Sequence, residues 1–296
     1  MDLRHLRYFV QVAEELHFAR AAAHLGISQP PLSQQIRALE DELGVRLLDR
    51  TSRRVTLTPA GKLFLEAARA TLQQADQAII VARRAARGEL GELAIGFNAS
   101  APFVPRIARG ISDFRALYPE VKLILSESAG PSQIEAIEDH VLDIGFLRSA
   151  GMPRLPGTVI AHPLLRERLF VAMPPDHRLA ARAEVHLADL GGEPLLFYAM
   201  GQSGFTEDVI TMLRDAGVSP NVAQIVREVS TLFGLAAAGI GLVVLAESLC
   251  SLQSAKLAYR VLADEVATTV LWMVHLREGM TLPARHFVEI VGPTID

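Results

Sequence analysis

Serine and arginine side chains follow three apolar stretches in the C-terminal two thirds of the sequence. Ser100 comes after the stretch at 92–97, Ser128 after the one at 121–125, and Arg148 ends the stretch at 143–148. Strands that alternate with helices predict an α/β fold with mostly parallel sheets, whose ligands bind beyond the carboxyl ends of the strands, near helix N-termini. Hydroxyl groups and a guanidinium at such an edge suit a small carboxylate, because arginine can hold both of its oxygens.

A purely structural interpretation explains the same residues. Arg148 could pair with an acidic side chain at the surface, and the serines could cap helices. The residues alone leave both interpretations open.

Motifs typical of enzymes are incomplete in this sequence. The segment GIGLVV at 239–244 lacks the third glycine of a dinucleotide-binding motif, and GQSGF at 201–205 departs from the nucleophile-elbow pattern. The nine histidines form no HExxH motif, and the single cysteine rules out CxxC. We therefore expect a protein that is not an enzyme and that needs neither a metal nor a cofactor.

A polar helix face in the N-terminal region suggests a second kind of recognition. In GISQPPLSQQIRALE, residues 26–40, and just beyond it, Leu32, Ile36, Leu39 and Leu43 recur at steps of four, three and four, which predicts one buried helical stripe. Ser28 can cap this helix, and the two prolines that follow fall in its first turn, where their missing N–H groups cost little. The opposite face carries donors and acceptors but no carboxylate: Gln29, Pro30, Ser33, Gln34 and Arg37.

The elements around this helix predict a winged helix-turn-helix. Helices at 3–15 and 18–25 precede it, and a tight turn at Gly26 joins the second helix to it. Two short strands follow at 45–58, and their turn carries Arg50, Arg53 and Arg54. In such a unit the second helix of the pair enters the major groove of double-stranded DNA, and the wing contacts the backbone or the minor groove. The alternative is a structural helical unit with a solvated polar face.

Residues 1–60 resemble the DNA-binding domain of LysR-type transcriptional regulators, and the rest of the chain is compatible with that family. The resemblance rests on the ordered positions of LRYFVQVAEELHFARAAAHLGISQPPLSQQIRALEDELGVRLLDRTSRRVTLTPAGKLF. It implies that Gln29, Ser33, Gln34 and Arg53 face DNA. The sequence departs from the family at Gln34, where arginine is more common, so its base preference there is expected to differ.

The resemblance also implies the architecture of the remaining chain. We expect a winged helix-turn-helix at 1–58, a linker helix at 59–89 and an effector-binding domain at 90–296. That domain resembles type 2 periplasmic binding proteins, with subdomain I at about 90–161 and 267–296 and subdomain II at about 162–266. The linker has neither proline nor glycine from residue 62 to 87. Its apolar residues repeat every three or four positions, which indicates a dimerising helix or one that packs on its own domain.

Within the family, the sequence resembles regulators of aromatic-compound breakdown that sense benzoate, muconate or chlorinated muconates. In these proteins, residues matching Ser100 and Arg148 contact the inducer carboxylate, and the loop that holds Phe205 contributes from the second subdomain. A threonine expected near position 130 is Gly130 here, so a different ligand, or a pose that uses Ser128 or Ser132, is expected. The resemblance further implies a homodimer that assembles into a homotetramer and acts on RNA polymerase.

Composition is consistent with a DNA-binding regulator in the cytoplasm. Residues 1–90 carry a net charge of +3 and residues 91–296 one of −7, so the basic charge lies on the DNA-binding side. The N-terminus lacks a signal-peptide pattern, and the longest apolar run, 232–246, is shorter than the roughly 20 residues that cross a bilayer. Two alternatives are a solute-binding module without a transcriptional role and a redox-sensing regulator based on Cys250, which we expect to be a buried, unreactive thiol.

Overall fold

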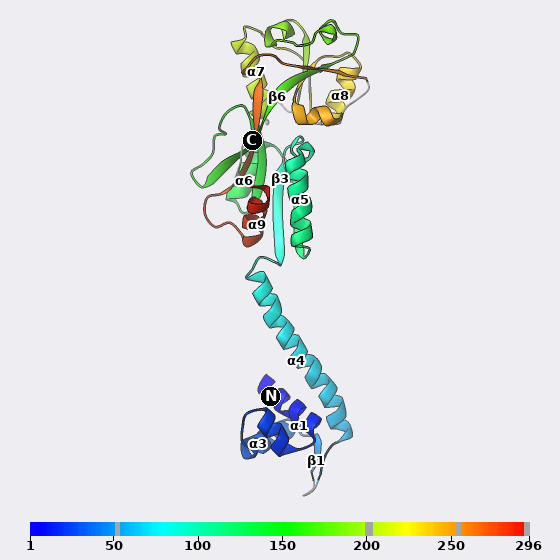
Figure 1. Ribbon diagram of the computed structural model, residues 1–296, viewed down its shortest axis with the longest axis vertical. Helices are drawn as coiled ribbons and strands as arrows, with labels where there is room; N and C mark the ends of the chain where they lie inside the picture. Colours follow the sequence, from blue (N-terminus) through cyan, green and yellow to red (C-terminus); the bar gives the residue numbers. More distant parts are fainter. Residues whose placement is uncertain (51–53, 199–203, 253–255, 293–296) are drawn as a thin grey trace. The chain divides into compact units, whose positions relative to one another are not determined.

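The computed structural model describes residues 1–50, 54–198, 204–252 and 256–292. The chain forms two compact units, Met1–Ala86 and Arg87–Asp296. Figure 1 shows the helices and strands of each unit.

The first unit is the predicted winged helix-turn-helix. It contains α1 (Leu3–Glu15), α2 (Phe18–His24), α3 (Gln29–Leu43) and a hairpin of β1 (Leu48–Arg50) and β2 (Val55–Leu57). Phe9, Leu32, Ile36 and Leu39 are fully buried in its core. Two details differ from the prediction. Ser28 precedes α3 but its side chain makes no capping hydrogen bond, and Leu43 lies outside the buried stripe with 36% of its surface exposed.

The long helix α4 (Pro59–Ala85) begins against the hairpin. The Thr58 hydroxyl accepts a hydrogen bond from the Gly61 N–H at 2.9 Å. A side chain at Gly61 would place its Cβ 2.0 Å from the Leu47 carbonyl oxygen, so only glycine allows this close approach. The N-terminal part of α4 packs on α1, where the rings of Phe64 and Phe9 meet edge to face at 5.1 Å.

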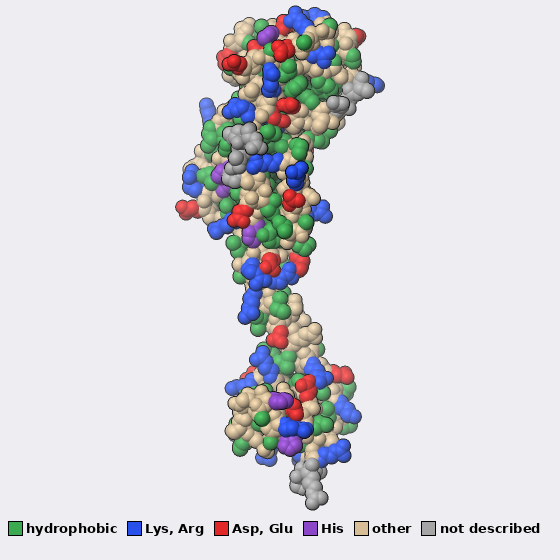
Figure 2. All heavy atoms as spheres, in the orientation of Figure 1, with side chains coloured by type: hydrophobic (Ala, Val, Ile, Leu, Met, Phe, Trp, Pro, Cys, Tyr) green, Lys and Arg blue, Asp and Glu red, His purple; other side chains and the backbone are tan. Residues whose placement is uncertain are grey.

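The C-terminal part of α4 leaves apolar side chains uncovered. Ile79, Ile80 and Val81 are 48%, 48% and 45% exposed. Figure 2 shows hydrophobic side chains on the surface of this helix. Burial of such side chains against a partner is favourable, so a dimerising helix stays our prediction for this surface.

The second unit consists of two α/β halves joined by long strands. One half contains β3 (Gly91–Phe97), α5 (Pro105–Leu117), β4 (Val121–Glu127), α6 (Gly130–Glu138), β5 (Ile144–Ser149) and α9 (Leu282–Val291). The other contains β7 (Pro194–Tyr198), α7 (Gly204–Asp215), β8 (Asn221–Val226), α8 (Val229–Ala237), β9 (Val243–Ala246) and β10 (Ala258–Val261). The strands β6 (Val159–Met173) and β11 (Thr268–Leu276) connect the halves (Figure 1). Short 3-10 helices include η1 (Ala101–Phe103) and η4 (Glu247–Leu252).

The strand directions correct the expectation of mostly parallel sheets. The large sheet has the order β10-β6-β11-β5-β3-β4, with β9 also paired to β6. In this sheet β3 is parallel to β4 and β5, whereas β11 is antiparallel to β5 and β6, and β6 is antiparallel to β9 and β10. The first half of β6 is mostly half-buried and lacks a continuous apolar run, so local apolar patterning does not mark the full length of this strand.

Two histidines link β6 to β11 on the face that packs toward α9. The Nε2 atoms of His162 and His275 are 3.1 Å apart, and their rings stack. The Nδ1 atom of His275 lies 2.7 Å from the carbonyl oxygen of Leu276, which can only accept, so Nδ1 carries a hydrogen. Neutral His275 therefore accepts at Nε2, and His162 donates to it. Burial lowers the pKa of both imidazoles.

This pair makes the stability of the second unit depend on pH. A pKa that is lower in the folded state than in the unfolded state favours folding above the unfolded value, about 6.5, and this contribution is lost as the pH falls below it. We expect the thermal unfolding midpoint to drop between pH 7.5 and 5.5, and to drop less in His162→Phe. The control is His140→Asn, because His140 is exposed and its φ of 57° is one that asparagine tolerates. An equal drop in wild type and His162→Phe would contradict this role.

Candidate functional site

The outward face of α3 carries the predicted polar side chains. Gln29, Pro30, Gln34 and Arg37 are exposed and Ser33 is half-buried, while the opposite side of the helix is in the core. Asp41, Glu42 and Leu43 follow only near the C-terminal end of the helix. The first three turns therefore present amides, a hydroxyl and a guanidinium to solvent, and these groups are suited to base edges and phosphates. Of the predicted wing residues, Arg54 is exposed and Arg53 lies outside the described residues.

A carboxylate on α3 holds the hairpin in place. Glu40 accepts hydrogen bonds from the backbone N–H groups of Leu47 and Leu48 at 2.9 and 3.0 Å, and its other oxygen lies 2.5 Å from Nη2 of Arg50. The Arg50 guanidinium also lies over the ring of Phe18, 5.0 Å from its centroid. Burial lowers the pKa of this guanidinium. Arg50, which the sequence analysis placed in the turn of the hairpin, ends β1, and its charge fixes the hairpin against α3.

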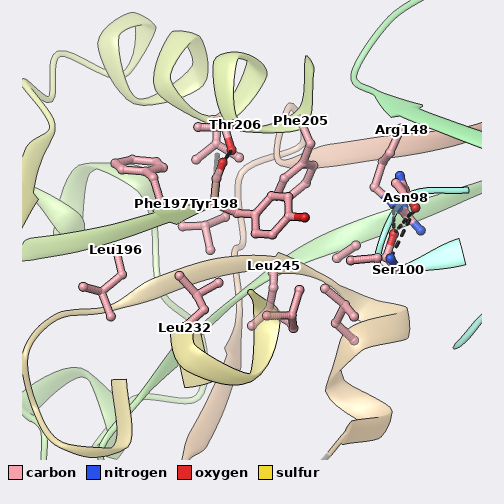
Figure 3. Close-up of a pocket in the computed structure, with 16 residues that line it drawn as sticks. Asn98, Ser100, Arg148, Leu196, Phe197, Tyr198, Phe205, Thr206, Leu232 and Leu245 are labelled. Atoms are coloured by element: carbon pink, nitrogen blue, oxygen red, sulfur yellow. Dashed lines mark hydrogen bonds between the residues drawn. The ribbon is translucent and has the colours of Figure 1, made fainter. Parts of the chain in front are cut away.

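The second unit contains a cavity between its two halves, shown in Figure 3. Its polar end is formed by Asn98 and Ser100, which follow β3, and by Arg148 on β5. Phe205, the predicted residue of the second half, lines the cavity from α7. The remaining wall is mostly apolar and includes Leu196, Phe197, Val209, Val229, Leu232, Val244, Leu245, Ala246 and Leu249.

Arg148 is the central polar group of this cavity, and its side chain is only 2% exposed. Its Nε donates to the Ser100 hydroxyl at 2.9 Å, and its Nη2 lies 2.5 Å from a carboxylate oxygen of Glu167 and 3.3 Å from the Ser248 hydroxyl. Its Nη1 is buried and has no hydrogen-bond partner among the described residues. The guanidinium group thus has one nitrogen without an acceptor, and an unpaired buried donor of this kind is costly unless something accepts from it.

Glu167 is a site residue that the sequence interpretation missed. It lies on β6, is 7% exposed, and accepts a hydrogen bond from the Ser248 N–H at 2.8 Å. Its carboxylate and the Arg148 guanidinium form a buried ion pair, in contrast to the surface pair of the structural interpretation. Burial lowers the pKa of Arg148, and the attraction of Glu167 opposes that effect. Nothing in the local sequence marks this pairing, because the two residues lie on strands separated by β11.

Ser100 positions Arg148 rather than offering its hydroxyl to the cavity. Its oxygen accepts from Arg148 Nε, and its hydrogen is used toward Asn98 Oδ1 at 3.0 Å. Asn98 Oδ1 also accepts from the N–H groups of Ser100 and Ala101, at 3.3 and 3.0 Å, which identifies this atom as the oxygen. The Asn98 amide NH2 is therefore a donor that these bonds leave unused at the cavity. The only sequence signal for Asn98 is its position directly after a strand.

Two other predicted residues, Ser128 and Gly130, do not line this cavity. The Ser128 carbonyl accepts a hydrogen bond from the buried Gln133 side chain at 2.8 Å. Gly130 begins α6, where an added Cβ would lie 3.6 Å from Leu147 Cδ2. The structure thus brings together Ser100, Arg148 and Phe205 and leaves the Ser128–Gly130 segment outside the cavity wall.

Tyr198 brings a phenol to the cavity wall. Burial and the nearby carboxylates of Glu127 and Glu228 raise its pKa, so the phenol stays protonated. Glu127 ends β4 in one half, and Tyr198 ends β7 in the other. The phenol and this carboxylate therefore meet where the two halves face each other.

Cys250 lies in η4 and is half-buried. Burial and the carboxylates of Glu247 and Glu167 raise the pKa of its thiol to about 12. The reactive thiolate is therefore scarce near neutral pH, which argues against cysteine-based redox sensing. Among the described residues, no group of three or more metal-ligating side chains comes together, and no helix is long and apolar enough to cross a membrane.

Comparisons with known proteins give a consistent result for both units. Residues 3–62 match the family model for a bacterial regulatory helix-turn-helix protein of the lysR family, and residues 86–295 match the LysR substrate binding domain. The chain is 43% identical to the uncharacterized HTH-type transcriptional regulator YnfL of Escherichia coli K12, covering 96% of this chain and 95% of YnfL. It is 39% identical to BenM of Acinetobacter baylyi, covering 92% and 89%. The structure of full-length CbnR with its target DNA has a TM-score of 0.83 and 28% identity, covering 98% of each chain.

The Glu40 contacts lead to a prediction for the first unit. Glu40→Ala leaves two backbone N–H groups and the Arg50 guanidinium without their acceptor, which should lower the free energy of unfolding by about 3 kcal/mol. Glu40→Gln keeps one acceptor oxygen and should lose less. Urea unfolding of the full chain, followed by circular dichroism, measures both. Asp41→Asn, at an exposed position of the same helix, is the control, and equal stability of Glu40→Ala and Asp41→Asn would contradict the anchoring role.

Proposed function

The chain belongs to the LysR family of bacterial transcriptional regulators, and we propose that the effector bound by its C-terminal unit is a small organic carboxylate with an apolar body. The protein is a DNA-binding regulator with an effector-binding domain. Because such a protein binds DNA, we also propose that it works in the cytoplasm.

The observation that carries the effector proposal is the unpaired Nη1 atom of Arg148. Nη1 is a buried, charged donor, and Arg148 lines the polar end of an otherwise apolar cavity. A carboxylate would accept from Nη1 with one oxygen and from the Asn98 amide with the other, which gives both donors a charged acceptor. The apolar walls and the ring of Phe205 would enclose a hydrocarbon or aromatic body. Ser100 supports this arrangement by holding Arg148 at Nε.

DNA contacts are proposed for α3 and the wing. Gln29, Ser33 and Gln34 carry the hydrogen-bonding groups that read base edges in the major groove, and Pro30 packs at the start of the helix beside them. Arg37 can contact a phosphate or a guanine. On the wing, Arg53 and Arg54 supply charge toward the backbone or the minor groove.

The uncovered apolar surfaces support a homodimer that assembles into a homotetramer. The exposed residues Ile79, Ile80 and Val81 of α4 offer one interface. A second is offered by the edge strands β4 and β8, where Ile124, Leu125, Val222 and Ile225 are 37% to 46% exposed. Unpaired strand edges with apolar side chains favour pairing with another chain. On DNA, this assembly would act on RNA polymerase.

Regulation follows from the position of the cavity between two halves. A ligand that contacts Arg148 in one half and Phe205 in the other binds the closed arrangement more tightly than the open one. Ligand binding then shifts the population toward the closed state, and only this difference in affinity can be passed to the DNA-binding unit.

The experiment compares two variants for two kinds of binding. Isothermal calorimetry measures benzoate and cis,cis-muconate, with benzamide as the uncharged analogue, and gel shifts measure DNA selected by the wild-type protein from a random duplex pool. Arg148→Met combined with Glu167→Gln removes both buried charges, so it should lose carboxylate binding at least tenfold and keep DNA binding. Arg37→Ala should weaken DNA binding and leave carboxylate binding unchanged.

Three results of these measurements would contradict a part of the proposal. Equal binding of benzamide and benzoate would show that a neutral acceptor suffices at Arg148. Loss of DNA binding in the folded double variant would contradict the separation of the two sites, and full carboxylate binding by that variant would refute the role of Arg148.

A further inference from the structure

The hydroxyl of Thr269 is buried beside the Arg148–Glu167 ion pair. Thr269 lies on β11 and is 1% exposed, and its Oγ1 has no hydrogen-bond partner among the described residues. A buried hydroxyl without a partner destabilises the state in which it is unpaired, so native structures contain few of them. This one therefore needs an explanation.

The strand register places Thr269 between the two charged residues. The order β6-β11-β5 puts β11 in the middle, with Thr269 opposite Glu167 on β6 and Leu271 opposite Arg148 on β5. Residues directly opposite on neighbouring strands point to the same face, as do residues two apart on one strand. Arg148, Thr269 and Glu167 therefore share one face, and the ion pair passes over the middle strand that carries the unpaired hydroxyl.

We propose that Thr269 is a positioning residue of the effector site, which gives Glu167 a partner when an effector carboxylate engages Arg148. This inference rests on the proposed function. In the structure, Arg148 Nη2 lies 2.5 Å from a carboxylate oxygen of Glu167. When the guanidinium turns toward the effector, the Thr269 hydroxyl donates to Glu167, which keeps its bond from the Ser248 N–H. Directly opposite side chains have Cβ atoms about 5 Å apart, so a rotation of the Glu167 side chain brings its carboxylate within reach.

The exchange would give the two states different hydrogen-bond partners. Without effector, the ion pair is made and the Thr269 hydroxyl is unpaired. With effector, Arg148 bonds to the ligand and Glu167 to Thr269, so no buried charge is left without a partner. Because β6 and β11 join the halves of the unit, this exchange takes place at the strands that must adjust when the cavity closes.

A double-mutant cycle tests the proposal without any ligand. Thr269→Val is introduced into the wild type and into Arg148→Met, a background in which Glu167 has lost its arginine and should already use Thr269. We expect Thr269→Val to raise the thermal midpoint of the wild type, because it removes an unpaired hydroxyl, and to lower that of Arg148→Met. Thr269→Ser keeps the hydroxyl and is the control. The same sign of change in both backgrounds would overturn the proposal.

A ligand measurement adds a second, independent result. Calorimetry with benzoate should show about tenfold weaker binding to Thr269→Val and near wild-type binding to Thr269→Ser, since one hydrogen bond to a charged group is lost. Unchanged benzoate affinity in Thr269→Val would overturn the proposal. Failure of the wild type to bind benzoate or cis,cis-muconate would count against the proposed effector class, while the cycle still decides the role of Thr269. If Arg148→Met does not fold, a lowered midpoint for Thr269→Val in the wild type overturns the proposal.

Discussion

The buried ion pair between Arg148 and Glu167 is the interaction on which the effector site depends. Charges can stay in a protein interior only if they are paired and hydrogen-bonded. Here, side chains and backbone groups from several helices, strands and loops supply these hydrogen bonds. Ser100 holds the guanidinium at Nε, Asn98 holds Ser100, and Ser248 binds the carboxylate. The pair also crosses the middle strand β11, so it ties β5 of one half to β6, one of the two strands that join the halves.

In the first unit, the carboxylate of Glu40 plays a similar structural role. It accepts hydrogen bonds from two backbone N–H groups and pairs with Arg50. This contact fixes the hairpin relative to α3, so a binding face made of a helix and a wing keeps one geometry. In each unit, a partly or fully buried carboxylate therefore positions groups of the proposed binding face.

Local patterns in the sequence predicted individual helices and strands better than the contacts between distant segments. The stripe of Leu32, Ile36 and Leu39 located α3, and strand ends located Ser100 and Arg148, because these signals repeat within a few residues. The length of β6, the helix α9 and the antiparallel middle of the large sheet were missed, since they depend on packing between distant segments. Glu167 was missed for the same reason. Its role comes from an arginine two strands away, and the roles of Asn98 and Ser100 likewise became clear only from the hydrogen bonds around that arginine.

The most direct test of this account is a crystal structure of the full chain with a bound carboxylate, cis,cis-muconate or benzoate, at a resolution that shows the partners of the Arg148 guanidinium. We expect a carboxylate oxygen within hydrogen-bond distance of Arg148 Nη1 and the body of the ligand against Phe205. A ligand bound elsewhere, with Nη1 still unpaired and the contact to Glu167 unchanged, would contradict it.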